Sequence, residues 1–221
     1  IRPAEDTEIA EILKTRLFAD IDPKAAAAAG AAYETLYENL GDAGLPDGAD
    51  QPAAYAKRVI DSYPFHPELI RVLDKRIGTI PEFQRARGAL RLLAEVVAAE
   101  WETHGDAPTL NVGDVDLDAG NVLINLTAGL GRDAYEPAAR VDITDPDSHA
   151  RSVDTERFTG KAPYASRAAT CVFMHSLEQS TAAGAARGEY LLGTLRPGDA
   201  PEAISEALDV LSQRAWHLAF D

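Results

Sequence analysis

The sequence predicts a mainly α-helical fold, with a helical-bundle subdomain followed by a truncated winged-helix-like module. Three observations indicate this class. Apolar residues recur every three or four positions along most of the chain, the spacing of one helix face. Residues that start and end helices flank these stretches. Only the segment after residue 215 alternates with the period of two expected of a strand.

Four helices are expected before residue 78. Asp22 followed by Pro23 is typical of an N-cap and a first helical residue, and Gly41 is a typical helix end. Pro67 opens the fourth helix, and Gly78 ends it. Together with the apolar stripes, these signals predict helices at about residues 4–18, 23–40, 52–62 and 67–77.

A fifth helix is expected to follow a capping box. Thr79 and Glu82 have the T-x-x-E spacing in which each side chain satisfies a free backbone N–H group. An apolar face then continues to about residue 102. The pattern therefore predicts a compact helical unit at residues 1–104, which the resemblance described below implies is lid-like. An irregular helical connector follows at residues 105–163, with weak helices near 119–130 and 133–141.

The last part, residues 164–221, is expected to hold three helices and then a strand. Trp216, Leu218 and Phe220 alternate with less apolar residues, as in a strand. Three helices followed by a strand is the order of a winged-helix unit. The module is expected to be truncated in its wing. The first two helices are predicted at about residues 164–179 and 187–195, and the third opens at residues 199–202 and runs to about residue 214.

Charge and composition restrict the partners. The formal charge is −15, from 36 acidic and 21 basic residues, which disfavours nucleic acid and anionic lipid. Cys171 is the single cysteine, so no intrachain disulfide is expected. The sequence has no leader pattern and no run of about 18 apolar residues. We therefore expect a cytoplasmic protein with no membrane segment.

Arg87 is the first candidate functional residue. On a helical wheel it lies on the shoulder of the apolar stripe, where a buried, unpaired guanidinium costs several kcal/mol. It is therefore expected either to contact a γ-phosphate from a helical lid or to form an ion pair with Glu82 or Asp74. From the residues alone, the ion pair is the favoured alternative.

Three further arginines are weaker candidates. Arg85 and Arg91 lie closer to the solvent face of the same predicted helix. Arg16 ends the first helix, where the helix dipole accounts for a cation, and a role at a subunit boundary is open.

The histidines are expected to have structural roles and not catalytic or zinc-binding ones. His66 precedes Pro67 at a helix start, so its ring is expected to cap free N–H groups or to pack against Tyr63 and Phe65. His175 is expected in the core. It does not form a nucleophile–base pair with Ser176, because adjacent side chains on a helix point about 100° apart. The histidine spacings fit no zinc motif.

Asp114, Asp116 and Asp118 are spaced like the first ligands of a calcium loop. Ala119 stands where that loop needs glycine, and Asn125 replaces its bidentate glutamate. A solvated turn followed by an Asp-capped helix is expected instead, with no metal. The chain also lacks a P-loop and a G-x-S-x-G elbow, so it carries no recognisable catalytic set.

Several strings resemble a family of large bacterial AAA-superfamily P-loop ATPases that share a conserved region of unknown role. Some members of that family occur in phage-defence loci of the growth-limitation and exclusion type. The resemblance is patchy between about residues 130 and 165, and Ala86 stands where the family tends to have threonine. The strings are EIAEILKTRLF, YPFHPELIRVL, FQRARGALRLLA, GDVDLDAGNV, HSLEQ and LRPGDAPEAISEALDVLSQRAWHLAF.

The resemblance implies that this chain is the lid and winged-helix-like part of an ATPase. ATP and Mg²⁺ would bind in the parent protein, against a P-loop core that is expected to precede Ile1 and to be the main partner of this part. The Ala-Arg-x-Ala-Leu pattern at 86–90 places Arg87 in the sensor-2 position of such lids. The isolated chain is expected neither to bind ATP tightly nor to hydrolyse it.

Two alternatives belong to other classes. A winged-helix DNA-binding module would need cations on its third helix, but that helix has Glu202, Glu206 and Asp209 against Arg214. A helical protein-interaction domain would use the acidic surface to bind a basic partner.

Overall fold

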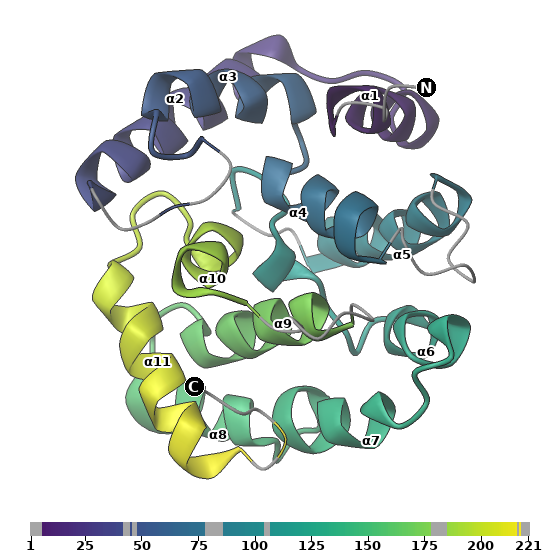
Figure 1. Cartoon of the computed structure of the whole chain (residues 1–221), viewed down its shortest axis with the longest axis vertical. Helices are drawn as coiled ribbons and strands as arrows, with labels where there is room; N and C mark the ends of the chain where they lie inside the picture. Colours follow the sequence, from purple (N-terminus) through teal and green to yellow (C-terminus); the bar gives the residue numbers. More distant parts are fainter. Residues whose placement is uncertain are drawn as a thin grey trace.

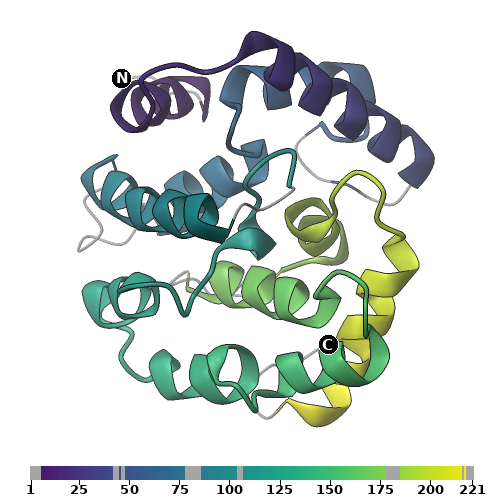
Figure 2. The same ribbon diagram turned by 180° about the vertical axis from the view of Figure 1, so that it is seen from behind.

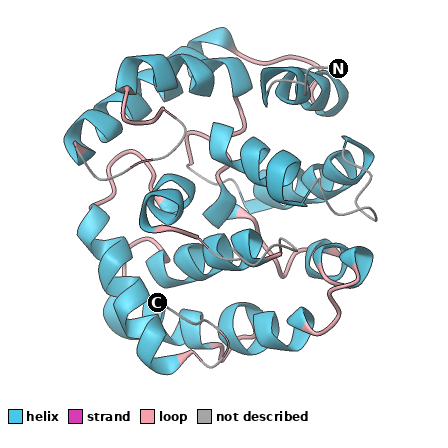
Figure 3. Ribbon diagram, viewed as in Figure 1, coloured by secondary structure: helices cyan, strands magenta, loops and turns pink. Residues whose placement is uncertain are grey.

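The computed structural model describes residues 6–41, 45, 48–77, 86–103, 107–177, 185–215 and 217. Within these residues, all the regular secondary structure is helical (Figure 3), which confirms the mainly α fold. None of the described helices combines the length and the apolar character needed to cross a bilayer.

The helices of the first half lie where the sequence predicts them. The fourth continues as a π-helix and is shorter in its α-helical part than expected. The capping box at Thr79 and Glu82 falls outside the described residues. The observed elements are α1 (Asp6–Leu17), α2 (Pro23–Leu40), α3 (Pro52–Ser62), α4 (Pro67–Arg71), η1 (Val72–Ile77) and α5 (Ala86–Thr103).

The middle of the chain is more helical than predicted, because α8 lies outside the two weak helices that were expected there. Only Ala150 and Val153 of α8 are buried, so the sequence has almost no apolar stripe to reveal the helix. The Ser148 hydroxyl caps it by accepting the Arg151 N–H. The elements here are η3 (Val112–Asp114), α6 (Val122–Leu126), η4 (Ala128–Leu130), α7 (Tyr135–Ala139), η5 (Arg140–Thr144) and α8 (His149–Arg157).

Three helices close the described chain, as predicted: α9 (Tyr164–Ser176), α10 (Arg187–Thr194) and α11 (Pro201–Arg214). The strand predicted from Trp216, Leu218 and Phe220 lies outside the described residues. The winged-helix-like module and the division at residues 104 and 163 therefore stay predictions.

The helices are stacked in layers along the longest axis of the molecule (Figure 1). α1, α2 and α3 form one end, α4 and α5 come next, α9 and α10 follow, and α7, α8 and α11 form the other end. The reverse view shows the same order (Figure 2). One continuous cluster of buried apolar residues, from Ala10 to Leu211, connects the layers.

Helix α9 lies at the centre of the second half, in contact with α8, α10, α11, η3 and η5. Most of its residues are buried, and many are small. Small residues allow close approach: a Cβ atom on Gly113 of η3 would lie 2.7 Å from the carbonyl oxygen of Arg167. This close packing brings the polar groups of η3 directly against α9.

Candidate functional site

The arginines singled out from the sequence do not meet in the described structure. Arg87 is the second residue of α5, but its side chain lies outside the described residues, and Arg85 lies outside them altogether. Arg91 is 69% exposed, with its Nε 3.9 Å from Glu95 Oε1. Arg16 is exposed in the last turn of α1. The nucleotide-sensing role of Arg87 therefore stays a prediction.

A buried ion network forms instead around Asp114, which was expected to lie in a solvated turn. That expectation is wrong for Asp114, because its carboxylate is fully buried beside Arg196. Arg196 donates to Asp114 Oδ1 from Nη2 at 2.6 Å and from Nε at 3.0 Å. The Asn111 N–H donates to Asp114 Oδ2 at 2.9 Å, which fixes the carboxylate within η3.

The Asp-capped helix was also not found. Helix α6 begins after Asn121, whose side chain makes no capping hydrogen bond. Asp118 instead forms an exposed ion pair with Arg151 at 3.4 Å. Among the described residues, no group of three or more metal-binding side chains is present.

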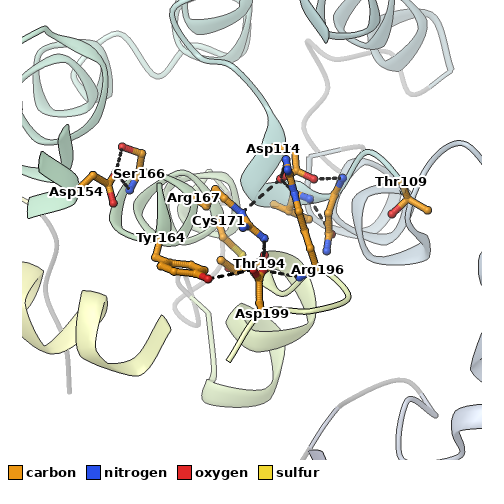
Figure 4. A network of polar contacts seen from close by, with 12 residues as sticks. Thr109, Asp114, Asp154, Tyr164, Ser166, Arg167, Cys171, Thr194, Arg196 and Asp199 are labelled. Atoms are coloured by element: carbon orange, nitrogen blue, oxygen red, sulfur yellow. Dashed lines mark hydrogen bonds and ion pairs between the residues drawn. The ribbon is translucent and has the colours of Figure 1, made fainter. Parts of the chain in front are cut away.

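Arg167 of α9 carries the network to the segment between α10 and α11 (Figure 4). Its Nη2 donates to the carbonyl oxygen of Thr194 and, at 2.9 Å, to Asp199 Oδ2. Its Nε lies 3.6 Å from Asp114 Oδ1. The Tyr164 hydroxyl donates to Asp199 Oδ1 at 3.2 Å, and the Arg196 N–H donates to Asp199 Oδ2 at 2.9 Å. Two arginines and two aspartates thus connect three parts of the chain.

The charges of the network shift the pKa values of Arg196 and Tyr164. Burial alone would lower the pKa of Arg196, but the Asp114 carboxylate reverses this and leaves the pKa raised. Burial, and then the charge of Asp199, raises the pKa of the Tyr164 hydroxyl, which therefore remains a donor. Asp154 of α8 caps α9 by accepting from the N–H groups of Ala165 and Ser166.

A cavity of about 220 Å³ lies beside the network. Gly113 and Asp114 of η3, Thr144 of η5, and Arg167 and Arg196 are among its lining residues. Within the described residues, Arg167 Nη1 and Thr144 Oγ1 are buried and have no hydrogen-bond partner. The cavity therefore offers hydrogen-bond donors to a small molecule. The chain's thiol, Cys171, is buried, and burial raises its pKa far above the ordinary value.

Two expectations for the histidines are confirmed: His66 caps a helix, and His175 lies in the core. His66 Nδ1 accepts the Glu68 N–H at 3.2 Å, so the ring caps α4. The other ring nitrogen must then carry the proton that it shares with the Tyr37 hydroxyl at 2.7 Å. His175 is fully buried, 3.5 Å from Glu68, and Ser176 donates to the Val172 carbonyl oxygen.

A family model for the DUF499 second domain matches residues 4–185. The chain belongs to the DUF499 second-domain family. No curated protein and no solved structure matches it. The DUF499 match includes Asp114 and Arg167 but ends before Arg196 and Asp199, so it covers only one side of the ion network.

Sequence reasoning missed Arg167, Arg196 and Asp199. A signal for Arg167 was present, because it is the one arginine in YASRAATCVFM, a stretch of mostly small and apolar residues at positions 164–174. A charge in such a stretch needs a buried partner. No local spacing identified that partner, because Asp114 and Asp199 are far away in the sequence.

Proposed function

We propose that this DUF499 domain is the helical lid of a larger AAA-type ATP-binding protein. In this proposal Arg87 senses the γ-phosphate of ATP, and movement of the lid transmits the nucleotide state to α9, α10 and α11. The observation that carries the proposal is the position of Arg87 within the FQRARGALRLLA string, in the first described turn of the 18-residue helix α5. A planar guanidinium suits the charge that develops during phosphoryl transfer.

A route for transmission supports the proposal. Helix α5 contacts α1 and α6, and its residue Glu100 lines the cavity beside the ion network. Burial, and then the nearby Asp114 carboxylate, raises the pKa of Glu100, while Arg196 acts in the opposite direction. A shift of α5 would therefore change the electrostatic balance of the network that joins η3 to the last three helices.

ATP and Mg²⁺ would be held mainly by the P-loop core of the parent protein. That core would supply the phosphate-binding lysine and the magnesium-binding acid, and it would be the principal partner of this domain. Arg87 would add one charge-assisted contact, which acts only when the lid closes over the nucleotide. The isolated domain is expected not to hydrolyse ATP.

The test is ATP hydrolysis by the full-length gene product with Arg87→Ala. We expect activity to fall at least about tenfold, which corresponds to roughly 1.4 kcal/mol of activation free energy. Arg91→Ala is the matched control, since Arg91 lies one turn further along α5 and is exposed. Its activity should stay within about twofold of wild type. Unchanged hydrolysis in Arg87→Ala would refute the sensing role.

A winged-helix DNA-binding function receives less support. Arg214 is the cation that such a module would direct at DNA, but its Nη1 is 2.7 Å from Glu156 Oε2. Glu202 and Asp209 lie exposed on the same helix. A DNA mobility shift that weakens with added salt would favour this alternative over the lid.

A further inference from the structure

The cavity beside the ion network contains buried polar groups whose hydrogen bonds are incomplete. The Arg167 side chain is only 4% exposed, yet two of its three nitrogens make no hydrogen bond within the described residues. Thr144 Oγ1, on another wall of the cavity, is also buried and also makes no hydrogen bond within the described residues. A buried polar group without a partner costs about 1–3 kcal/mol, and more when it is charged. A molecule that supplied acceptors to these groups would therefore stabilise the fold.

The donors of Arg167 indicate what such a molecule must present. Nη2 already donates to Thr194 and Asp199, so Nη1 is the group that can donate a charge-assisted hydrogen bond to a carboxylate. The Thr144 hydroxyl can donate a further bond to the same group. One end of the cavity is thus suited to a carboxylate.

The balance of charge around the cavity argues against a simple anion. Its lining contains three arginines and three acids, so their formal charges cancel: Arg151, Arg167, Arg196, Glu100, Asp114 and Asp116. An added anion would leave the cavity negative in a protein whose net charge is already −15. A ligand that carries a positive charge as well as a negative one would leave the formal charge of the lining unchanged.

The carboxylate of Asp116 is the group that would bind a positive charge in the cavity. It is exposed and lines the cavity, and its Oδ1 accepts the N–H of Asp118 at 2.9 Å. A carboxylate can accept several hydrogen bonds, so Asp116 retains capacity for an ammonium group.

We propose that this cavity binds a small zwitterion of the amino-acid type. Its carboxylate accepts hydrogen bonds from Arg167 Nη1 and Thr144 Oγ1, and its ammonium group lies near Asp116. The volume of about 220 Å³ is below the roughly 300–1,000 Å³ of sites for drug-sized ligands, which suits a molecule of this size. The proposal does not depend on ATP binding by a parent protein.

Isothermal titration calorimetry on the full 221-residue chain tests the proposal. The probes are glycine, β-alanine and 4-aminobutyrate, which carry both charges at increasing separation. Acetate, ethylammonium and inorganic phosphate carry one kind of charge each. We expect saturable binding of at least one zwitterion, about tenfold or more tighter than binding of any single-charge probe.

Two conservative variants locate the binding. Thr144→Val removes the hydroxyl at similar volume, and Asp116→Asn removes an exposed charge, so neither should prevent folding. Each should weaken binding of that zwitterion at least about tenfold. Asp209→Asn, at an exposed acid of α11 away from the cavity, should leave it unchanged.

Three results would overturn the proposal. The first is no saturable binding of the three zwitterions up to roughly 20 mM, as expected if only water fills the cavity. The second is binding of acetate or phosphate as tight as that of the best zwitterion. The third is zwitterion binding that Thr144→Val and Asp116→Asn leave unchanged.

Discussion

At the scale of single residues, the Asp114 carboxylate is paired with two guanidinium groups, those of Arg167 and Arg196. Removing one partner of a buried ion pair leaves charge without compensation, at a cost of about 3–5 kcal/mol. We therefore expect Asp114→Asn to lower the free energy of unfolding by about that amount in urea titrations. Asp118→Asn, which breaks an exposed ion pair, should cost less than about 1 kcal/mol. Equal stability of the two variants would contradict the network.

His66 makes stability depend on pH. Burial, with a smaller effect of Arg58, lowers its pKa from 6.5 to about 3. The unfolded chain therefore binds the proton more readily between these pH values, so the contribution is complete above pH 6.5 and is lost as the pH falls. From pH 6.5 to 5 the loss should be about 2 kcal/mol.

The variant His66→Asn tests this dependence. An asparagine oxygen can still accept the Glu68 N–H, but the side chain does not titrate. Urea unfolding of the variant should show a weaker loss of stability between pH 6.5 and 5 than wild type. The same slope in both proteins would show that His66 is not responsible.

These two residues also show which side chains a sequence can place. His66 was predicted to cap a helix because its partner is two positions away and Pro67 marks the helix start. Asp114 was misplaced because Arg196 is 82 positions away, beyond any local pattern. The role of a side chain could therefore be predicted where its partner lies a few positions away in the sequence, and not where the partner is distant.

At the scale of elements, helices with a strong apolar stripe were predicted and those without one were not. Helices α2 and α3 match their predicted bounds, because both a stripe and a starting proline were present. Helix α8 was missed because its residues are mostly polar. The short η3 was read as a turn, and it proved to be the element that positions Asp114.

The contact between η3 and α9 gives a prediction at this scale. Alanine at Gly113 would place its Cβ atom 2.7 Å from a backbone oxygen of α9, which no side-chain rotation can relieve. We expect Gly113→Ala to lower the thermal midpoint by an amount equivalent to about 1–3 kcal/mol. Gly129→Ala in η4 is the matched control, because its nearest neighbour is at 3.8 Å. A similar midpoint for both variants would contradict this packing.

At the scale of the whole molecule, one apolar core runs through all the layers. It includes residues of each of the three predicted parts, such as Leu13, Val122 and Leu211. We therefore expect the chain to unfold in a single transition in urea, with the same midpoint by circular dichroism and by hydrogen exchange in all three parts. Separate midpoints on either side of residue 163 would show independent units.

Function is the level that the sequence addresses least directly. The composition and the helical periods predict a fold class, but neither specifies a nucleotide. The role of Arg87 comes from the resemblance of one string to AAA-type lids, and the zwitterion site comes from contacts between distant residues. These two proposals are independent and are tested separately.

Hydrogen exchange of the full-length gene product, with Mg²⁺–ATP and with Mg²⁺–ADP, tests whether α5 responds to the γ-phosphate. A lid that senses the γ-phosphate should show slower exchange of the amides in α5 with ATP than with ADP, and Arg87→Ala should abolish that difference. Exchange in α5 that is the same with both bound nucleotides, or a gene product that binds neither, would contradict the account.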